Sequence, residues 1–133
     1  MDFNKLKESA FAAANFSYAP YSNFHVGAAI LCSDGSIFTG CNVENRSYGL
    51  TICAERSAVS NAVITGHTSF IAVAVYCMDS DSPVPPCGAC RQVLTEFCSS
   101  DVPVFYSGRN NDYKMILMGD LYPADSLHDL KNF

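Results

Sequence analysis

The sequence has no long hydrophobic run and few basic residues. Its longest unbroken apolar stretch covers residues 70–78, whereas a membrane-spanning helix needs about 20 apolar residues. Eight lysines and arginines stand against thirteen aspartates and glutamates, which gives a formal net charge of -5, and the basic residues form no cluster. A polyanionic partner would therefore meet little electrostatic attraction. We expect neither a membrane protein nor a nucleic-acid-binding protein.

Internal repeats, low-complexity tracts and linkers are also absent, and we expect no signal peptide because the N-terminal residues lack its apolar core. A chain of 133 residues fits a single domain that spans residues 1–133. Its 49% of hydrophobic residues is enough to form a core. The seven cysteines are an odd number without the dense spacing of a disulfide-rich domain, so they indicate free thiols and a cytoplasmic protein.

Helix-like and strand-like spacings of apolar residues alternate along the chain. Apolar residues three and four positions apart predict helices over residues 3–14, 53–65 and 87–98. Apolar and β-branched runs predict strands over residues 26–32, 37–43, 70–78, 103–106 and 113–117. The turn residues at 33–36 join the first two strands as a hairpin. The pattern predicts an α/β layered domain with an irregular or weakly helical end, and it leaves the strand order open.

A pair of cysteines, Cys87 and Cys90, follows Pro86 at the start of the last predicted helix. At about 100° per residue, positions three apart on a helix lie within about 60° of each other, so both sulfurs can reach one ion. Taken alone, the pair fits a redox Cys-x-x-Cys motif or two core cysteines as well as it fits a metal site. A third cysteine, Cys53, begins the preceding predicted helix and is followed two positions later by Glu55.

The spacing of Cys53 and Glu55 fixes where they lie on their helix. Residues two apart in the middle of a helix point about 200° away from each other, so these two serve one centre only from a helix end. We therefore expect two helix N-termini to converge on a zinc ion, where the helix dipoles stabilise thiolates. A structural zinc has four protein ligands, whereas a catalytic zinc has three and leaves one position to water. Three cysteines beside a carboxylate predict the catalytic kind.

A fourth protein ligand would make the zinc structural, and the other cysteines and the histidines are the candidates. A lone cysteine is usually a small buried apolar residue, and a lone histidine is usually a surface or hydrogen-bonded core residue. Since none has the spacing of a ligand pair, we assign none of them. They are Cys32, Cys41, Cys77, Cys98, His25, His67 and His128.

Two segments resemble the small homotetrameric cytidine deaminases: Cys53-Ala54-Glu55-Arg56 and Pro86-Cys87-Gly88-Ala89-Cys90-Arg91-Gln92. The resemblance continues through Tyr18-Ala19-Pro20-Tyr21-Ser22, residues 24–29 and residues 40–45, and covers roughly residues 10–100. It implies a three-layer α/β/α domain with a central mixed sheet of about five strands. It also implies one zinc ion (Zn²⁺) per subunit, held by Cys53, Cys87 and Cys90, and a homotetramer with composite active sites.

The resemblance implies hydrolytic deamination of cytidine and deoxycytidine to uridine and deoxyuridine, with release of ammonia, in pyrimidine salvage. Water activated at the zinc would attack C4 of cytosine, while Glu55 carries protons to N3 and to the leaving amine. Three thiolates leave one excess negative charge on the zinc site. Arg56 can offset this charge by donating to cysteine sulfurs, whereas Arg91 is expected to lie on the surface.

The substrate-binding residues are implied by the resemblance: Phe24 against the pyrimidine ring, Asn42 and Glu44 on two ribose hydroxyls, the backbone of Ala54 at the base, and Tyr48 offered across a subunit interface. The alternation of a strand points Asn42 and Glu44 to the same face, which suits that role. Without the resemblance, both are turn or surface residues and Phe24 is a core residue.

The C-terminal segment departs from the family pattern. Where the family has an aromatic residue after Leu-Leu-Pro, this chain has the segment Leu121-Tyr122-Pro123-Ala124-Asp125-Ser126. The missing aromatic approaches a neighbouring subunit's ligand in the family. Tyr122 and Phe133 are the candidates to replace it.

Two other functions stay open. A deaminase of the same scaffold could act on a cytosine-bearing antibiotic, a nucleotide or an RNA base. The acidity of the chain and the lack of a phosphate-binding glycine loop disfavour RNA and nucleotides, and Asn42 with Glu44 favours a nucleoside over an antibiotic. A zinc-stabilised domain without activity, or a thiol redox switch, would make Glu55 dispensable.

Overall fold

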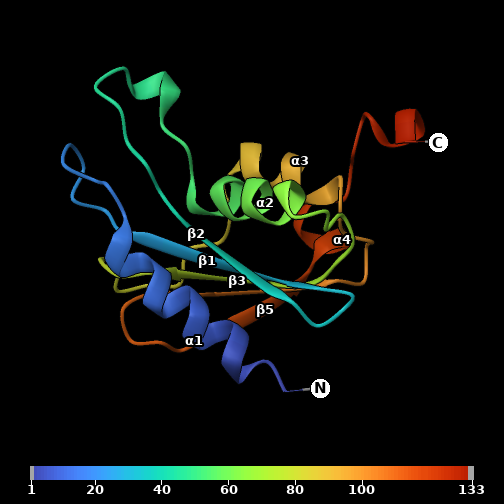
Figure 1. Cartoon of the computed structure of the whole chain (residues 1–133), viewed down its shortest axis with the longest axis horizontal. Helices are drawn as coiled ribbons and strands as arrows, with labels where there is room; N and C mark the ends of the chain where they lie inside the picture. The colour runs from blue at the N-terminus through green and yellow to red at the C-terminus, as the bar shows by residue number, and fades with distance from the viewer. Residues whose placement is uncertain (1, 132–133) are drawn as a thin grey trace.

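The computed structural model describes residues 2–131. A five-stranded mixed sheet lies between one helix on one face and two helices on the other, which confirms the three-layer α/β/α domain (Figure 1). The helices are α1 (Asn4–Ala13), α2 (Ala54–Ile64), α3 (Gly88–Thr95) and α4 (Met118–Leu121), with 3₁₀ turns at Ala14–Phe16, Tyr48–Leu50 and His128–Lys131. The strands are β1 (Val26–Cys32), β2 (Ile37–Cys41), β3 (Phe70–Cys77), β4 (Pro103–Ser107) and β5 (Lys114–Leu117).

The strands lie in the order β2-β1-β3-β4-β5. Only β3 and β4 run parallel, and α3 lies on the long connection that parallel neighbours require. The predicted hairpin of β1 and β2 is confirmed, with Gly35 at a positive φ of 92° in its turn. The predicted second strand is two residues too long, because β2 ends at Cys41. Val43 leaves the sheet and bridges Tyr18 and Ile52 instead.

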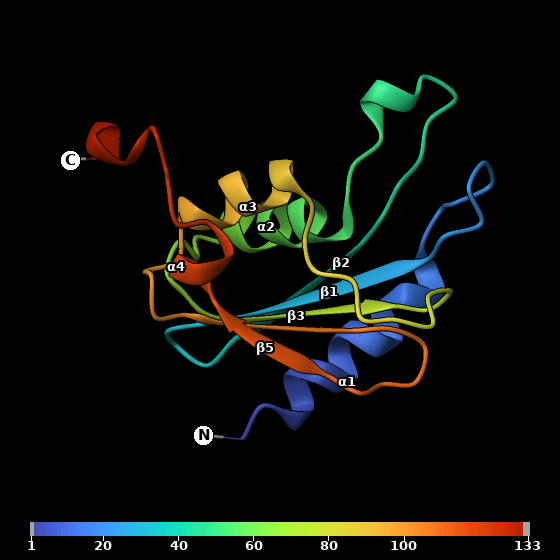
Figure 2. The same cartoon turned by 180° about the vertical axis from the view of Figure 1, so that it is seen from behind.

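The two faces of the sheet are covered differently (Figure 2). On the α1 face, small side chains such as Ala10, Ala29 and Ala74 pack closely, and a Cβ at Gly27 would lie only 2.0 Å from the Ala10 carbonyl oxygen. On the other face, a Cβ at Gly40 would lie 2.3 Å from the Ala58 nitrogen of α2. Both glycines therefore permit a helix backbone to rest directly on the sheet.

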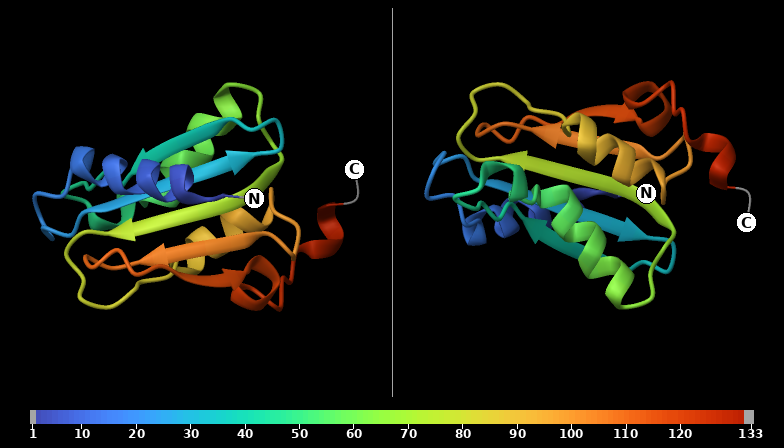
Figure 3. Two further views of the ribbon diagram at one scale, coloured as in Figure 1. Left: turned by 90° about the horizontal axis from the view of Figure 1, so that it is seen from below. Right: turned by 90° about the horizontal axis from the view of Figure 1, so that it is seen from above.

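Helices α2 and α3 lie side by side on the upper face, whereas α1 crosses the lower face alone (Figure 3). The helix predicted over residues 87–98 is shorter in the structure, where α3 ends at Thr95. Two segments project on the side of α2 and α3: the loop before α2 and the C-terminal segment after α4 (Figure 1). Among residues 2–131, no helix combines the length and the apolar character needed to cross a bilayer.

Candidate active site

Three cysteine sulfurs gather where the N-termini of α2 and α3 meet. Cys53 and Cys87 are the N-cap residues of the two helices, both with extended backbone, and Cys90 lies fully buried in the first turn of α3. The three sulfurs lie within 4.8 Å of one another, and Sγ of Cys53 is 3.9 Å from Sγ of Cys87. The structure therefore brings these residues together at two converging helix ends, where the dipoles favour thiolates.

The surroundings of Cys53 favour the thiolate form of this cysteine. A hydrogen bond from the Cys90 thiol, together with donation from Arg56, lowers the pKa of Cys53 to about 5, although burial opposes the shift. The same bond and burial raise the pKa of Cys90 above its usual value. A thiolate of this kind is the form in which cysteine binds a metal.

Glu55 follows Cys53 by two positions and is buried in the first turn of α2, with 5% of its surface exposed. Burial raises the pKa of this carboxyl group to about 7, and the negative charge of Cys53 adds to the rise. A group with this pKa can both accept and release a proton near neutral pH. Glu55 therefore has the properties of a proton carrier.

A cavity of about 200 Å³ opens beside these groups. Its walls include the predicted residues Phe24, Asn42, Ala54 and Glu55, together with Cys53 and Cys87. Six further residues line it that the sequence did not single out: Val26, Thr51, Val75, Cys77, Val84 and Pro85. Apolar walls with a few polar groups suit a flat ring that bears a small number of hydrogen-bonding atoms.

Glu44 and Tyr48 lie in an adjoining hollow of about 450 Å³ with Tyr21, Ser22 and Thr51, and Thr51 borders both spaces. The Glu44 carboxylate accepts hydrogen bonds from the backbone of Tyr21 and Ser22. Asn42 is instead buried at the cavity beside Cys53 and Glu55, where its side-chain amide donates to the Phe24 carbonyl oxygen at 2.8 Å and accepts from the Val26 N–H at 2.9 Å. The structure thus separates Asn42 and Glu44 into neighbouring hollows.

Known proteins resemble this chain in sequence and in structure. The family model described as "Cytidine and deoxycytidylate deaminase zinc-binding region" matches residues 2–106. The chain belongs to this deaminase family. The cytidine deaminase of Halalkalibacterium halodurans is 46% identical over 124 residues, which cover 93% of each chain. The cytidine deaminase of Mycobacterium tuberculosis is 46% identical over 132 residues, 98% of this chain and 94% of that one.

Solved structures of the family agree with the fold. The 1.6 Å crystal structure of cytidine deaminase from Burkholderia pseudomallei superposes with a TM-score of 0.87 at 46% identity, and covers 92% of this chain and 98% of that one. The cytidine deaminase from Mycobacterium leprae superposes with a TM-score of 0.78 at 40% identity, and covers 93% and 99% of the two chains.

The cysteine trio of this deaminase fits a zinc ion. Ligands about 2.3 Å from a tetrahedral zinc lie about 3.8 Å from one another, close to the 3.9 Å between the sulfurs of Cys53 and Cys87. Within residues 2–131, no further cysteine, histidine or carboxylate joins the group. His25 pairs with Asp79 and His67 pairs with Asp34, each at 2.8 Å. This donor set leaves room for a ligand that the protein does not supply.

Arg56 lies against the trio. Its Nη2 donates to Sγ of Cys53 at 3.3 Å and to the Thr51 carbonyl oxygen at 3.3 Å. Its Nε is buried without a partner among the described residues. The guanidinium is thus placed to reduce the negative charge on the thiolates of the family's zinc site.

Arg91 is not a surface residue, which corrects the expectation from the sequence. Its side chain is half-buried, Nε donates to the Pro86 carbonyl oxygen at 2.8 Å, and Nη1 donates to the Leu121 carbonyl oxygen at 3.1 Å. The reason is that the segment after β5 folds back over α3 and presents its carbonyl group. Arg91 therefore fixes the loop directly before Cys87.

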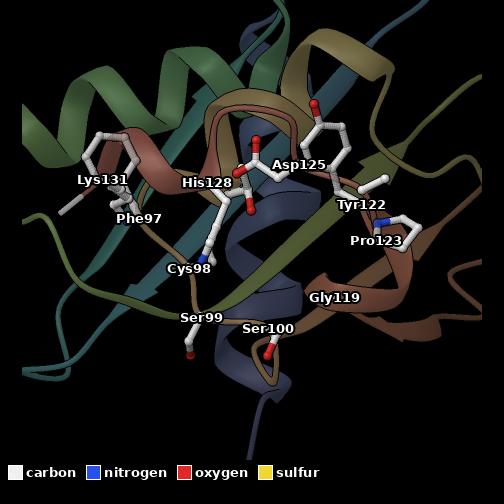
Figure 4. Close-up of a pocket in the computed structure, with 12 residues that line it drawn as sticks. Phe97, Cys98, Ser99, Ser100, Gly119, Tyr122, Pro123, Asp125, His128 and Lys131 are labelled. Atoms are coloured by element: carbon white, nitrogen blue, oxygen red, sulfur yellow. The ribbon is translucent and has the colours of Figure 1, made fainter.

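Another hollow, of about 830 Å³, lies away from this site (Figure 4). Its walls come from the end of α3, the following loop and the C-terminal segment, and include Tyr122, His128 and Lys131. Tyr122, a candidate for the missing aromatic, lines this hollow and not the cavity beside Cys53, and its hydroxyl group donates to Oε1 of Gln92. Phe133, the other candidate, lies outside the described residues.

Proposed function

We propose that this chain is a zinc-dependent hydrolase that deaminates cytidine and deoxycytidine to uridine and deoxyuridine and releases ammonia. One observation carries the proposal: a buried carboxyl group stands beside three clustered cysteine sulfurs at an apolar cavity. A domain that used zinc only for stability would have no reason to bury an ionisable group there, since burial of an unpaired carboxylate is costly. The names of the relatives support cytidine as the substrate.

In this proposal Cys53, Cys87 and Cys90 hold one zinc ion, and Arg56 limits the negative charge of the sulfurs. A bound zinc ion acidifies a coordinated water molecule and so supplies a nucleophile near neutral pH. Glu55 would accept a proton from the attacking water and donate it to N3 of the cytosine ring. It would then carry the proton of the new C4 hydroxyl group to the amine, which leaves as ammonia, so that the two protons of water end on N3 and on ammonia. Because Glu55 is buried, bulk water does not exchange protons with it during these transfers.

The two hollows divide the substrate between them. A cavity of about 200 Å³ is smaller than the roughly 300–1,000 Å³ of a typical ligand site, so it encloses the base alone. Phe24 lies against the ring there, and the backbone of Ala54 is within reach of its polar edge. The sugar then extends past Thr51 into the hollow that holds Glu44 and Tyr48. Glu44 binds one ribose hydroxyl group, and Asn42, which lines the neighbouring cavity, binds another.

The test is turnover by purified protein. Zinc-loaded protein mixed with cytidine should release one ammonia per uridine, with the accompanying change in ultraviolet absorbance, and chelation of the metal should abolish both. Parallel assays with deoxycytidine, cytidine monophosphate, a cytosine-bearing antibiotic and a short RNA separate the rival substrates. A Glu55→Gln variant that binds zinc and still turns over at full rate would refute the proposal.

We further propose that the enzyme is a cytoplasmic homotetramer of pyrimidine salvage with active sites shared between subunits. The projecting loop before α2 exposes large apolar side chains, with Tyr48 at 75% and Leu50 at 67%, which are suited to burial against another copy. All seven cysteines lie within the described residues and are free thiols, as a reducing compartment requires. Light scattering after gel filtration should give four times the 14.4 kDa of the chain.

A further inference from the structure

We propose that Ser22 is a positioning residue, which couples the sugar-binding carboxylate to the wall of the base cavity. Its hydroxyl group donates to Oε2 of Glu44 and accepts a hydrogen bond of 3.0 Å from the backbone N–H of Phe24. One oxygen atom therefore joins a residue of each hollow. The inference rests on the proposed function, which assigns Glu44 to the ribose and Phe24 to the base.

The carboxylate of Glu44 depends on Ser22 for its orientation. Its Oε1 accepts from the backbone N–H groups of Tyr21 and Ser22 at 3.0 and 3.2 Å. The Ser22 hydroxyl donates to the other oxygen, Oε2. A carboxylate held at one oxygen alone can turn about that contact, whereas bonds to both oxygens fix its plane. Each oxygen accepts more than one hydrogen bond, so Oε2 keeps capacity for a sugar hydroxyl.

The same interactions favour the ionised form of Glu44. Donation from the Ser22 hydroxyl, followed by donation from the two backbone N–H groups, holds the pKa of Glu44 below its usual value, although burial opposes the shift. An ionised carboxylate accepts stronger hydrogen bonds than a neutral acid. The group therefore faces the sugar hollow as an acceptor throughout the neutral pH range.

The other partner of Ser22 leads into the base cavity. The chain turns sharply at Asn23, whose φ of 56° lies in the left-handed region that asparagine tolerates. This turn aims the N–H of Phe24 back at the Ser22 hydroxyl, while the Phe24 carbonyl oxygen accepts from Asn42 at 2.8 Å. Both backbone groups of Phe24 are thus held. The hydrogen-bonded series runs Glu44, Ser22, Phe24, Asn42 and Val26, and it connects the two hollows.

The experiment compares cytidine with 2′,3′-dideoxycytidine, which keeps the base and the 5′-hydroxyl group but lacks the 2′- and 3′-hydroxyl groups. For Ser22→Ala, we expect KM for cytidine to rise about tenfold with kcat within about twofold, because a group that binds substrate and transition state alike is weakened. The KM of dideoxycytidine as a substrate, or its Ki as a competitive inhibitor, should change no more than about twofold. Ser22→Thr keeps the hydroxyl group at an exposed position and should restore cytidine binding.

Ser17→Ala is the matched control. The Ser17 hydroxyl lies on the same loop but donates to the Ala14 carbonyl oxygen at 3.0 Å, at the end of the helix. If Ser22 had a merely structural role, Ser22→Ala would weaken the binding of cytidine and dideoxycytidine equally. Ser17→Ala, which removes a structural hydrogen bond of the same loop, would then show the same equal weakening. Either equal weakening or an unchanged KM in folded Ser22→Ala would overturn the proposal.

A double-mutant cycle provides the second test. In a Glu44→Ala background, Ser22→Ala should no longer change the ratio of the constants for the two nucleosides, because the carboxylate that it orients is gone. Effects that multiply independently would contradict the coupling. Failure of the wild-type, zinc-loaded protein to turn over cytidine would refute the proposed function and this inference together. Turnover with an unaltered ratio in Ser22→Ala would refute the role of Ser22 alone.

Discussion

Replacing Gly40 with alanine should displace the helix that carries Cys53 and Glu55. The added Cβ would lie 2.3 Å from the Ala58 nitrogen and 2.6 Å from the Ala54 carbonyl oxygen, both atoms of the α2 backbone. Ordinary contact begins at 3.4 Å, so α2 has to retreat by about 1 Å. No flexible side chain can absorb this shift, because the atoms in conflict belong to a helix backbone.

The expected cost follows from these distances. Overpacking of this kind lowers the free energy of unfolding by about 1–3 kcal/mol, which for a chain of this size lowers Tm by roughly 3–12 °C. A displacement of about 1 Å at the N-terminus of α2 also moves Cys53 away from Cys87 and Glu55 away from the substrate. We expect kcat/KM for cytidine to fall about a hundredfold and zinc affinity to fall with it.

Thermal unfolding, zinc content and cytidine turnover measure the three effects on one preparation. Ser60→Ala is the control, because Ser60 is exposed on the same helix and lies outside the loop that we propose to meet another subunit. A Gly40→Ala variant that melts with the wild type and holds one zinc per chain would refute the reasoning. An equal loss in Ser60→Ala would refute it as well.

Three other predictions follow from the site and its supports. Glu55→Gln should lower kcat by about 10²–10⁴ while zinc content, checked by elemental analysis, stays at one per chain. Arg91→Ala removes two charge-assisted hydrogen bonds to buried carbonyl groups and should destabilise the protein by about 1–3 kcal/mol in denaturant unfolding, whereas exposed Arg46→Ala should not. Although burial opposes it, donation from the backbone and ring of His25 holds the pKa of Asp79 below its usual value, so this carboxylate stabilises the fold above its unfolded pKa and the effect is lost as pH falls through the folded pKa. Asp79→Asn should therefore lower Tm at pH 7, and the difference from wild type should vanish in acid.

The zinc trio was predictable because its geometry is local. The spacing of Cys87 and Cys90 and the two-residue step from Cys53 to Glu55 determine which atoms share a helix end, whatever the rest of the chain does. The prediction of two converging helix N-termini required only one long-range assumption, that a single ion joins the two segments. Each helix then begins where its cysteine acts as N-cap.

The apolar strand and loop residues of the cavity wall were not predictable from the sequence. Val75 belongs to the buried strand β3, and apolar strand residues that line a cavity read the same as those that fill a core. Val84 and Pro85 carried a weak signal, since they directly precede the Pro86-Cys87 pair. The buried amide of Asn42 also escaped the alternation argument, because the strand ends at Cys41 and the chain beyond it no longer follows the sheet.

Arg91 and the strand order were missed for a common reason. The partner of Arg91 is the carbonyl group of Leu121, thirty positions further along the chain, and no periodicity links them. The parallel pairing of β3 with β4 likewise depends on how a long crossover closes. Contacts between distant segments are decided by the packing of the whole domain, which a single sequence reveals only through a resemblance.

The tether between Arg91 and Leu121 sets a boundary for redesigning the tail of this enzyme. A deletion or fusion placed after Tyr122 leaves that carbonyl group in position, so the loop entering Cys87 keeps its brace. A truncation that begins within α4 removes the Leu121 carbonyl group that accepts from Arg91. The loop before Cys87 then becomes more mobile, although every metal ligand is still present. Affinity tags and reporter domains therefore belong beyond this point.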